Sequence, residues 1–246
     1  MRKNKIKNKN GGGTGGIRRW RSVAFAAVVV GAAFIVVHYI LGSPPTVAFN
    51  ASGAVTNVML QEDPQNDSAS KPDWVSYFVQ NPSTKTWVHT TLFSVPAGTT
   101  VHMTILGYDG CTPPRNNFWS QVQGTTTGTV NLSIVNNKGV ATPPRDVSVI
   151  NGWAGCTVGH TFAIPALHLF IPVASPNALD SANNLCGVSP CTSGPHAVEI
   201  FNFKVPNHGG IFRWQCYVPC GGGFIDGNGG PMQTIGYMTG NMEVRA

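Results

Sequence analysis

The sequence predicts an all-β sandwich with long loops, preceded by a single N-terminal transmembrane helix. Two observations predict the sandwich. Beyond residue 41 the chain contains short runs rich in β-branched and aromatic residues, and Gly, Pro and Asn separate these runs. A third observation predicts the membrane helix, because the 20 positions from Ser22 to Leu41 carry no charged residue.

Basic residues dominate the first 21 positions. This segment contains eight cations and no acid: Arg2, Lys3, Lys5, Lys7, Lys9, Arg18, Arg19 and Arg21. Cations that precede an apolar helix mark its cytoplasmic side. We therefore expect a basic cytoplasmic tail over 1–21 in a single-pass protein of the cell membrane, with the C-terminal domain on the exoplasmic side.

The uncharged stretch 22–41 has the length of a membrane anchor. At about 1.5 Å per residue, a helix of this length spans the hydrocarbon core of roughly 30 Å. The alternative is a cleavable signal peptide, whose apolar core usually has about 7–15 residues. The following LGSPPT offers no clear A-x-A cleavage site. We expect an uncleaved anchor, followed by a stalk and linker over 42–72.

The charge of the chain is low and unevenly distributed. Lys and Arg number 16 and Asp and Glu number 10, so charged residues make up 11% of the chain, against about 25% in typical soluble domains. With 42% hydrophobic residues, the chain is neither disordered nor a charge-rich helical bundle. Without the eight cations of the tail, the remainder carries 8 − 10 = −2. The tail lacks aromatic interleaving and nucleic-acid-binding motifs, so we expect no nucleic-acid partner.

Residues 73–246 form the predicted exoplasmic domain. Thr99–Tyr108 alternates apolar and polar residues, which predicts one buried and one solvent-facing side. The other predicted strands are Asp73–Gln80, Thr86–Val95, Thr127–Asn136, Val198–Val205 and Gly210–Tyr217.

All six cysteines follow the predicted anchor, where an oxidising compartment permits disulfides. Cys186 and Cys191 are spaced to close a short loop, and Cys111 and Cys156 to form a longer link. Six cysteines allow 15 complete pairings, and the sequence does not choose among them.

Cys216 and Cys220 differ from the other four cysteines. They lie four positions apart at the end of an aromatic-rich strand and enter a glycine-rich loop that contains Met232. His160 begins the apolar run GHTFAIPAL upstream. Thiolate and thioether ligands combined with an imidazole favour copper among the biological metals. These four residues are therefore the candidate metal ligands.

The segments His160-Thr-Phe-Ala-Ile-Pro-Ala-Leu and Gln215-Cys-Tyr-Val-Pro-Cys-Gly together resemble the copper domain of cytochrome c oxidase subunit II. The stretch FSVPAGTTVHMTI also resembles the core hairpin of cupredoxins. The resemblance covers about 120 residues, discontinuously. It implies a Greek-key, cupredoxin-like sandwich in which His160, Cys216 and Cys220 bind copper and the backbone carbonyl of Val218 is a weak ligand.

The chain departs from that family in its copper loop. The family's pattern requires His and Met where this chain has Phe224 and Gly227. One predicted anchor also replaces the family's usual two helices. His168, flanked by apolar residues, is interpreted as part of a hydrophobic surface loop.

Three interpretations of the loop remain open. In the first, His160, Cys216, Cys220 and Met232 hold one copper ion that transfers single electrons. In the second, Cys216 and Cys220 form a disulfide, and the domain is a metal-free assembly or interaction subunit. In the third, the site carries Cu(I) as a copper chaperone.

The implied role is single-electron transfer or an accessory subunit of a respiratory complex, with a redox protein or other subunits of that complex as partners. As an enzyme the chain would be at most a non-catalytic electron-transfer subunit. It contains no nucleophile elbow, no H-E-x-x-H motif and no paired catalytic carboxylates. Asp109, Asp146 and Asp226 lie in turn-like contexts, where Asp is common.

Overall fold

A computed structural model describes residues 23–25, 27–34, 44–64, 74–110, 116–150, 158–176, 186, 188–218, 220 and 230–246. The chain divides into two compact units, Met1–Ser43 and Pro44–Ala246. In the first unit, residues 23–25 and 27–34 are helical. Among the described residues, no helix has both the length and the apolar character needed to cross a membrane. The other positions of the predicted anchor lie outside the described residues.

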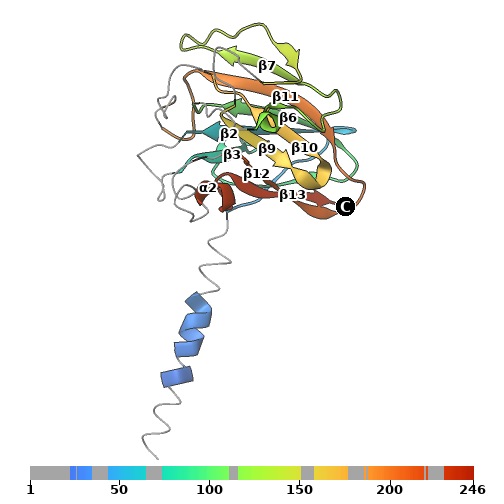
Figure 1. Ribbon diagram of the computed structural model, residues 1–246. Coiled ribbons are helices and arrows are strands. Elements are labelled where there is room, and N and C mark those ends of the chain that lie inside the picture. The colour runs from blue at the N-terminus through green and yellow to red at the C-terminus, as the bar shows by residue number, and fades with distance from the viewer. Residues whose placement is uncertain are drawn as a thin grey trace, which may run out of the picture. The chain divides into compact units, whose positions relative to one another are not determined.

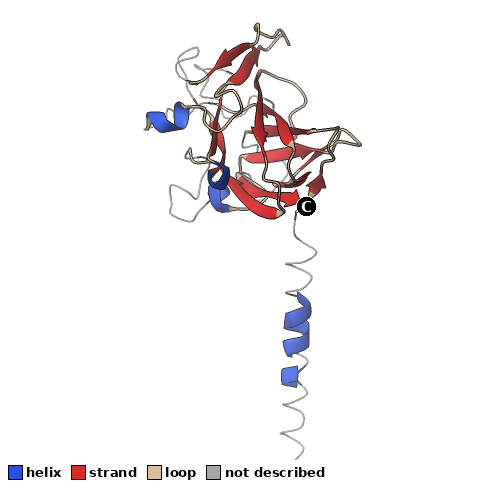
Figure 2. Ribbon diagram, turned by 90° about the vertical axis from the view of Figure 1, so that its right-hand side faces the viewer, coloured by secondary structure: helices blue, strands red, loops and turns tan. Residues whose placement is uncertain are grey.

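The second unit is built from two β-sheets (Figures 1 and 2). One sheet has six strands in the order β1-β5-β13-β12-β9-β10. Their bounds are Val47–Ala48 for β1, Leu92–Pro96 for β5, Thr239–Arg245 for β13, Gly210–Gln215 for β12, His160–Ile164 for β9 and Leu169–Val173 for β10. The 3-10 helix η3 (Pro165–Leu167) joins β9 to β10, and the short helix α2 (Gly230–Gln233) precedes β13.

The other sheet has seven strands in the order β4-β3-β2-β6-β11-β7-β8. Their bounds are Trp87–Val88 for β4, Ser76–Gln80 for β3, Val55–Asp63 for β2, Thr100–Gly107 for β6, His196–Lys204 for β11, Val130–Val135 for β7 and Arg145–Val147 for β8. The 3-10 helix η2 (Asn117–Ser120) precedes β7. Most neighbours are antiparallel, but β2 runs parallel to β6, and β5 runs parallel to both β1 and β13.

The core lies between the inner faces of the two sheets. Alternate residues of β6 and β11 are buried, as the alternating pattern of Thr99–Tyr108 predicted. Three large aromatic side chains meet in this core. Trp214 of β12 packs edge-on against Tyr77 of β3, with ring centroids 5.1 Å apart, and its centroid lies 4.9 Å from that of Phe162 of β9. These rings join the two sheets and support the end of β12, where Cys216 follows. The prediction of a β-sandwich is confirmed.

The predicted stalk over 42–72 is wrong for residues 44–64. This stretch contains β1 and β2, and β2 lies between β3 and β6 inside the seven-stranded sheet. The domain therefore begins at Pro44. At the end of β2 the polar residues Gln61 and Asp63 are buried, where the side-chain amide of Gln61 and the backbone amide of Cys191 both donate to Asp63.

The predicted strand Thr86–Val95 is two strands that belong to different sheets. β4 pairs with β3, whereas β5 pairs with β1 and β13. The chain changes sheets at Thr90 and Thr91, whose polar groups bond to other segments. The hydroxyl of Thr90 donates to the carbonyl of Pro45 at 2.7 Å, and the carbonyl of Thr91 accepts from the indole of Trp214 at 3.2 Å.

The segment after His168 is a strand and not a hydrophobic surface loop. Residues Leu169–Val173 form β10, whose edge pairs with β9, and Leu169 is fully buried. His168 itself caps η3 in the left-handed conformation, with φ of 52°. Of the apolar residues around it, Leu169 belongs to the core, and the partly buried Leu167 packs against the core from the other side of a tight turn.

The predicted disulfide between Cys186 and Cys191 is confirmed, with Cα atoms 5.4 Å apart. The predicted Cys111–Cys156 link lies outside the described residues. Cys216 and Cys220 are free thiols, which contradicts the alternative in which a disulfide joins them.

Candidate metal centre

His160 and Cys216 come together because their strands are neighbours in the six-stranded sheet. β12 pairs with β9 through Gln215 and Ala163. His160 begins β9 and Cys216 directly follows β12, so this antiparallel pairing places them side by side. The Nδ1 atom of His160 lies 3.7 Å from the Sγ atom of Cys216. Both residues are buried, with 3% and 0% of their surface exposed.

Two groups of Thr161 hold the sulfur of Cys216 in place. The backbone amide of Thr161 donates to this sulfur at 3.4 Å, and its hydroxyl donates to it at 3.8 Å. The same hydroxyl accepts a bond of 2.8 Å from the amide of Tyr217. On the other side, the amide of Cys216 donates to the carbonyl of Met238 at 2.8 Å. The position of the thiol is therefore set from two strands.

Cys220 completes a cluster of three ligand atoms. One nitrogen of His160 and the sulfurs of Cys216 and Cys220 all lie within 4.8 Å of one another, and all three residues are buried. The carbonyl oxygen of Val218 lies 3.4 Å from the sulfur of Cys216. The structure thus brings together four of the five residues that the sequence proposed as metal ligands.

Met232 is buried on α2, in the same core cluster as the two cysteines. Its neighbour Pro231 accepts a bond of 3.1 Å from the amide of Met238, and Met238 in turn accepts from Cys216. Two backbone hydrogen bonds thus connect α2 to the cysteine. The role of Met232 as a fourth ligand remains a prediction.

The far side of the His160 imidazole faces two carboxylates that the sequence analysis missed. Its Nε2 atom lies 2.8 Å from an oxygen of Asp109 and 3.3 Å from an oxygen of Glu62. Asp109 was interpreted as a turn residue, and it does accept a bond of 2.6 Å from the amide of Gly110. Its second oxygen orients the histidine. Glu62 and His160 share no sequence motif. They lie on β2 and β9, which belong to different sheets, and they meet only in the folded domain.

The two thiols have opposite acidities. Burial would raise the pKa of Cys216, but bonds from the Cys220 thiol and His160, together with the charge of His160, outweigh burial and lower this pKa well below its ordinary value. The bond to Cys216 and burial raise the pKa of Cys220 well above its ordinary value. Of the two thiols, Cys216 is therefore the one that loses its proton more readily.

The charge of His160 is set by the carboxylates behind it. Burial would lower the pKa of His160, but the charge of Glu62 and the bonds to Asp109 and Cys216 raise it well above its ordinary value. Burial raises the pKa of Glu62, and the nearby acids Asp109 and Asp63 raise it further, while the charge of His160 opposes them. A carboxylate behind a histidine ligand fixes the ring orientation and increases the donor strength of the opposite nitrogen.

These donors fit a soft metal ion. Two thiol sulfurs and one imidazole nitrogen are a donor set for copper or zinc, and a backbone carbonyl is a known weak ligand in copper sites. The deprotonated thiol that a metal requires is already favoured at Cys216.

An aromatic pair extends from the centre toward the surface. Tyr217, directly after Cys216, stacks on Trp119 of η2 with ring centroids 4.9 Å apart and an interplanar angle of 6°. Phe118 beside Trp119 is 37% exposed. Tyr217 also lines a hollow of about 200 Å³ together with Pro165 and Arg213. The hollow therefore lies beside Tyr217, the residue that directly follows Cys216.

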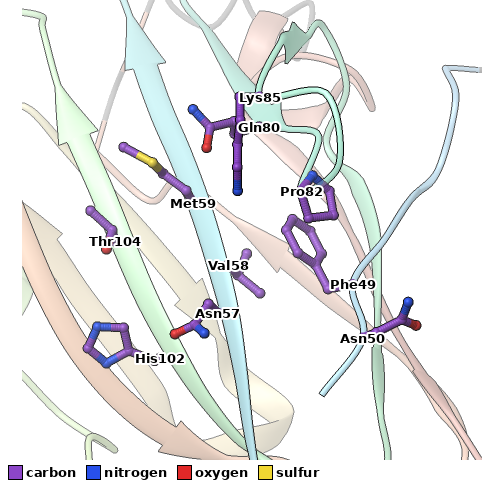
Figure 3. Close-up of a pocket in the computed structure, with 10 residues that line it drawn as sticks. All are labelled: Phe49, Asn50, Asn57, Val58, Met59, Gln80, Pro82, Lys85, His102 and Thr104. Carbon is purple, nitrogen blue, oxygen red and sulfur yellow. The ribbon is translucent and has the colours of Figure 1, made fainter. Parts of the chain in front are cut away.

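A second hollow, of about 380 Å³, is separate from the metal centre (Figure 3). It lies over β2 and β6, with His102 and Thr104 on β6 and Met59 on the neighbouring strand. His102 bonds to the side-chain oxygen of Asn202 at 2.8 Å. The described residues that line the hollow include no cysteine and no acid, so it lacks the donors found around His160.

No protein-family model matches the sequence, and no curated protein matches it. Solved structures give weak similarities. The metal-binding domain of the Cu(I)-exporting P-type ATPase CopA of Streptococcus pneumoniae D39, with Cu(I), aligns with a TM-score of 0.33 and 10% identity, over 83% of this chain and 100% of that domain. Rusticyanin from Thiobacillus ferrooxidans aligns with a TM-score of 0.30 and 13% identity, over 80% of this chain and 82% of its own. A rusticyanin variant gives 0.32 and 13%, over 85% and 91%. Similarities this weak do not indicate a function, and the function is inferred below from the geometry around His160.

Proposed function

We propose that the domain 44–246 is a cupredoxin-like copper protein that transfers single electrons. The observation that carries this proposal is the buried cluster of His160, Cys216 and Cys220, whose ligand atoms lie within 4.8 Å of one another. Copper bound there would cycle between two oxidation states, while the protein fixes its ligands. Thr161 holds one sulfur by two bonds, and Asp109 and Glu62 hold the imidazole.

Burial of the site favours electron transfer over copper delivery. All three ligands are at most 5% exposed, so a partner protein could not reach the metal to exchange ligands without opening the domain. An electron needs no such contact. The stacked rings of Tyr217 and Trp119 form an aromatic contact path from the residue after Cys216 to the partly exposed Phe118.

The membrane location and the assembly also belong to this proposal. The uncharged stretch 22–41 and the eight preceding cations support a single-pass anchor with the domain on the exoplasmic side. The partner is then a redox protein or another subunit of a respiratory complex at that surface. Membrane fractionation followed by protease treatment of intact cells tests this arrangement. A domain that resists protease in intact cells and becomes sensitive only after lysis would contradict it.

Copper loading of the full chain tests the metal centre. The wild-type protein, reduced and loaded with one equivalent of copper, should show thiolate-to-copper absorption and a Cu(II) EPR signal, and the thiolate-to-copper absorption should disappear in Cys216→Ser. The double variant Cys186→Ser/Cys191→Ser is the control, since it removes two sulfurs outside the centre and should keep both signals. A zinc ion in the same ligands would give neither signal, so the spectra also identify the metal.

Two outcomes would contradict the proposal. One is a loaded wild type whose spectra do not change in Cys216→Ser. The other is mass-spectrometric detection of a Cys216–Cys220 disulfide in protein isolated from its own membrane, which would return the domain to a metal-free interaction subunit.

A further inference from the structure

The three groups behind the copper ligands form a second, separate donor cluster. The Nε2 atom of His160 and one oxygen each of Glu62 and Asp109 lie within 4.8 Å of one another. These donors are hard or intermediate, one imidazole nitrogen and two carboxylates, in contrast to the thiols on the other side of the ring. Such a set suits Zn²⁺ or Mn²⁺.

Each carboxylate has one oxygen committed to the backbone and one directed at the histidine. The amide of Asp109 donates to one oxygen of Glu62 at 3.3 Å, and the amide of Gly110 donates to one oxygen of Asp109. The remaining oxygens face Nε2 at 3.3 and 2.8 Å. The cluster is therefore held in its orientation by backbone groups that are not themselves ligands.

The Glu62 oxygen that faces Nε2 of His160 lacks a hydrogen bond among the described residues. It is buried in a residue that is 1% exposed, and its 3.3 Å approach to Nε2 of His160 is an ion-pair contact only. A buried carboxylate oxygen without a partner is costly. Asp109 at the rim of the cluster keeps 16% of its side chain exposed, so an ion and its water ligands have a way in.

The spacing of these atoms fits a metal ion. With ligands about 2.1 Å from the ion, donors separated by 2.8 and 3.3 Å subtend angles of about 84° and 104°. These two values lie near the angles of octahedral and tetrahedral coordination, and all three donor atoms lie within 4.8 Å of one another.

We propose that Glu62, Asp109 and Nε2 of His160 bind a divalent cation of the Zn²⁺ class, with water completing its coordination. The cation site stands without copper, because Nδ1 can then carry the imidazole proton and face the Cys216 sulfur. If the proposed copper centre is filled as well, His160 bridges the two metals. With or without copper, Nε2 gives up the proton that faces Asp109 and Glu62, so one proton is released to solvent for each cation bound.

Cobalt(II) is the probe for this site, because its ligand-field absorption reports coordination where Zn²⁺ is silent. The full chain carrying Cys216→Ser and Cys220→Ser lacks both thiolates and isolates the second cluster. It should bind one equivalent of Co(II) with ligand-field bands and no thiolate charge-transfer band, and Zn²⁺ should displace the Co(II).

Adding Glu62→Gln to this variant should weaken Co(II) binding at least about tenfold, because a carboxylate ligand is lost. Asp109→Asn should do the same. Glu199→Gln is the matched control. It neutralises another fully buried carboxylate, bonded to the amide of Ala174 and not to His160, and should leave the affinity unchanged. Equal Co(II) binding in the parent, Glu62→Gln and Asp109→Asn would overturn the proposal.

If circular dichroism shows that the cysteine-free variant does not fold, the wild-type chain filled with one equivalent of Cu(I) replaces it. Cu(I) has a filled d shell and gives no ligand-field bands, so any such bands belong to Co(II) in the second cluster. The outcomes also separate the two proposals. Co(II) binding in the cysteine-free chain, with no copper binding in wild type, would leave this site standing and remove the copper function. The reverse result would remove this site alone.

Discussion

At the scale of single residues, Thr161 connects the metal centre to the strand that supports it. It offers its amide and its hydroxyl to Cys216, and the hydroxyl also accepts from the amide of Tyr217. Both atoms lie in a buried environment, so a lost partner is not replaced by water. The segment that leads to Cys220 begins directly after Tyr217.

Thr161→Val should therefore destabilise the domain although its shape is nearly unchanged. The substitution leaves the part-buried Tyr217 amide without its acceptor, which costs about 1 kcal/mol, at the low end of the range for a buried donor. Thr161→Ser keeps the hydroxyl and should lose much less. Urea unfolding of the three proteins measures the difference. Equal midpoints for the Val and Ser variants would show that the hydroxyl does not support this loop.

A second residue, Glu199, makes stability depend on pH. Burial raises its pKa from 4.5 to about 8, against the bond from the Ala174 amide, which lowers it. Between these values the unfolded chain releases the proton and the native chain keeps it. Stability contributed by Glu199 is therefore complete below about pH 4.5 and is lost as the pH rises to about 8.

Glu199→Gln should remove this dependence, because glutamine stays neutral and still accepts from the Ala174 amide. The two proteins should have similar stability near pH 5. Near pH 8 the variant should be more stable, by at most roughly 4–5 kcal/mol. Asp63, with its pKa raised by burial to about 6, contributes with the same sign to both proteins and cancels in the comparison. Parallel pH profiles of the urea midpoint would contradict the assignment.

At the scale of elements, the close approach of β13 to the turn before β5 allows these two strands to pair in the six-stranded sheet. A Cβ atom at Gly240 would collide with the carbonyl of Thr91. That carbonyl accepts from the indole of Trp214 and from the amide of Asn241. The glycine thus permits a contact on which the central tryptophan depends.

Gly240→Ala should destabilise the domain by roughly 3 kcal/mol or more, because the backbone must move and both bonds to Thr91 weaken. Gly210→Ala in the adjacent strand is the control. Its Cβ would meet only the ring of Phe212, at 3.3 Å, and the ring can rotate away. Thermal unfolding of the two variants measures the contrast. A similar loss of stability in both would show that the Thr91 contact is not limiting.

At the scale of the whole molecule, the domain depends on a strand that the sequence analysis placed in a stalk. β2 pairs antiparallel with β3 on one side and parallel with β6 on the other, and it carries Glu62 into the site. Without it, the buried apolar face of β6 loses a neighbour and β3 is left without a connection to its sheet.

A chain of residues 44–246 should therefore unfold cooperatively, whereas a chain of residues 73–246 should not fold. Circular dichroism and the cooperativity of urea unfolding distinguish them. The shorter chain contains every proposed copper ligand, so failure to fold would reflect the loss of β1 and β2 and not of the ligands. Cooperative unfolding of the shorter chain would support the prediction that residues 42–72 are a stalk outside the folded domain.

The sequence predicted the strands best where one face is buried and the other wet. Thr99–Tyr108 and Val198–Val205 became β6 and β11 nearly as expected, because the alternation of their residues records which face is inward. It failed at β2 and at the turn between β4 and β5. There buried polar groups bond to distant segments, and such partners leave no local pattern.

The sequence alone determined the donor chemistry of this protein and the uneven distribution of its charge. A thiol pair, an upstream histidine and a basic tail are visible as residue types at short spacing. Only the tertiary structure decided which groups meet. Asp109 and Glu62 contact Nε2 of His160, although they lie 51 and 98 positions from it in the sequence. Pairing of β12 with β9 brings Cys216 to His160, and packing of the two sheets brings Glu62 of β2 to the same ring. Neither contact is encoded near the residues it joins.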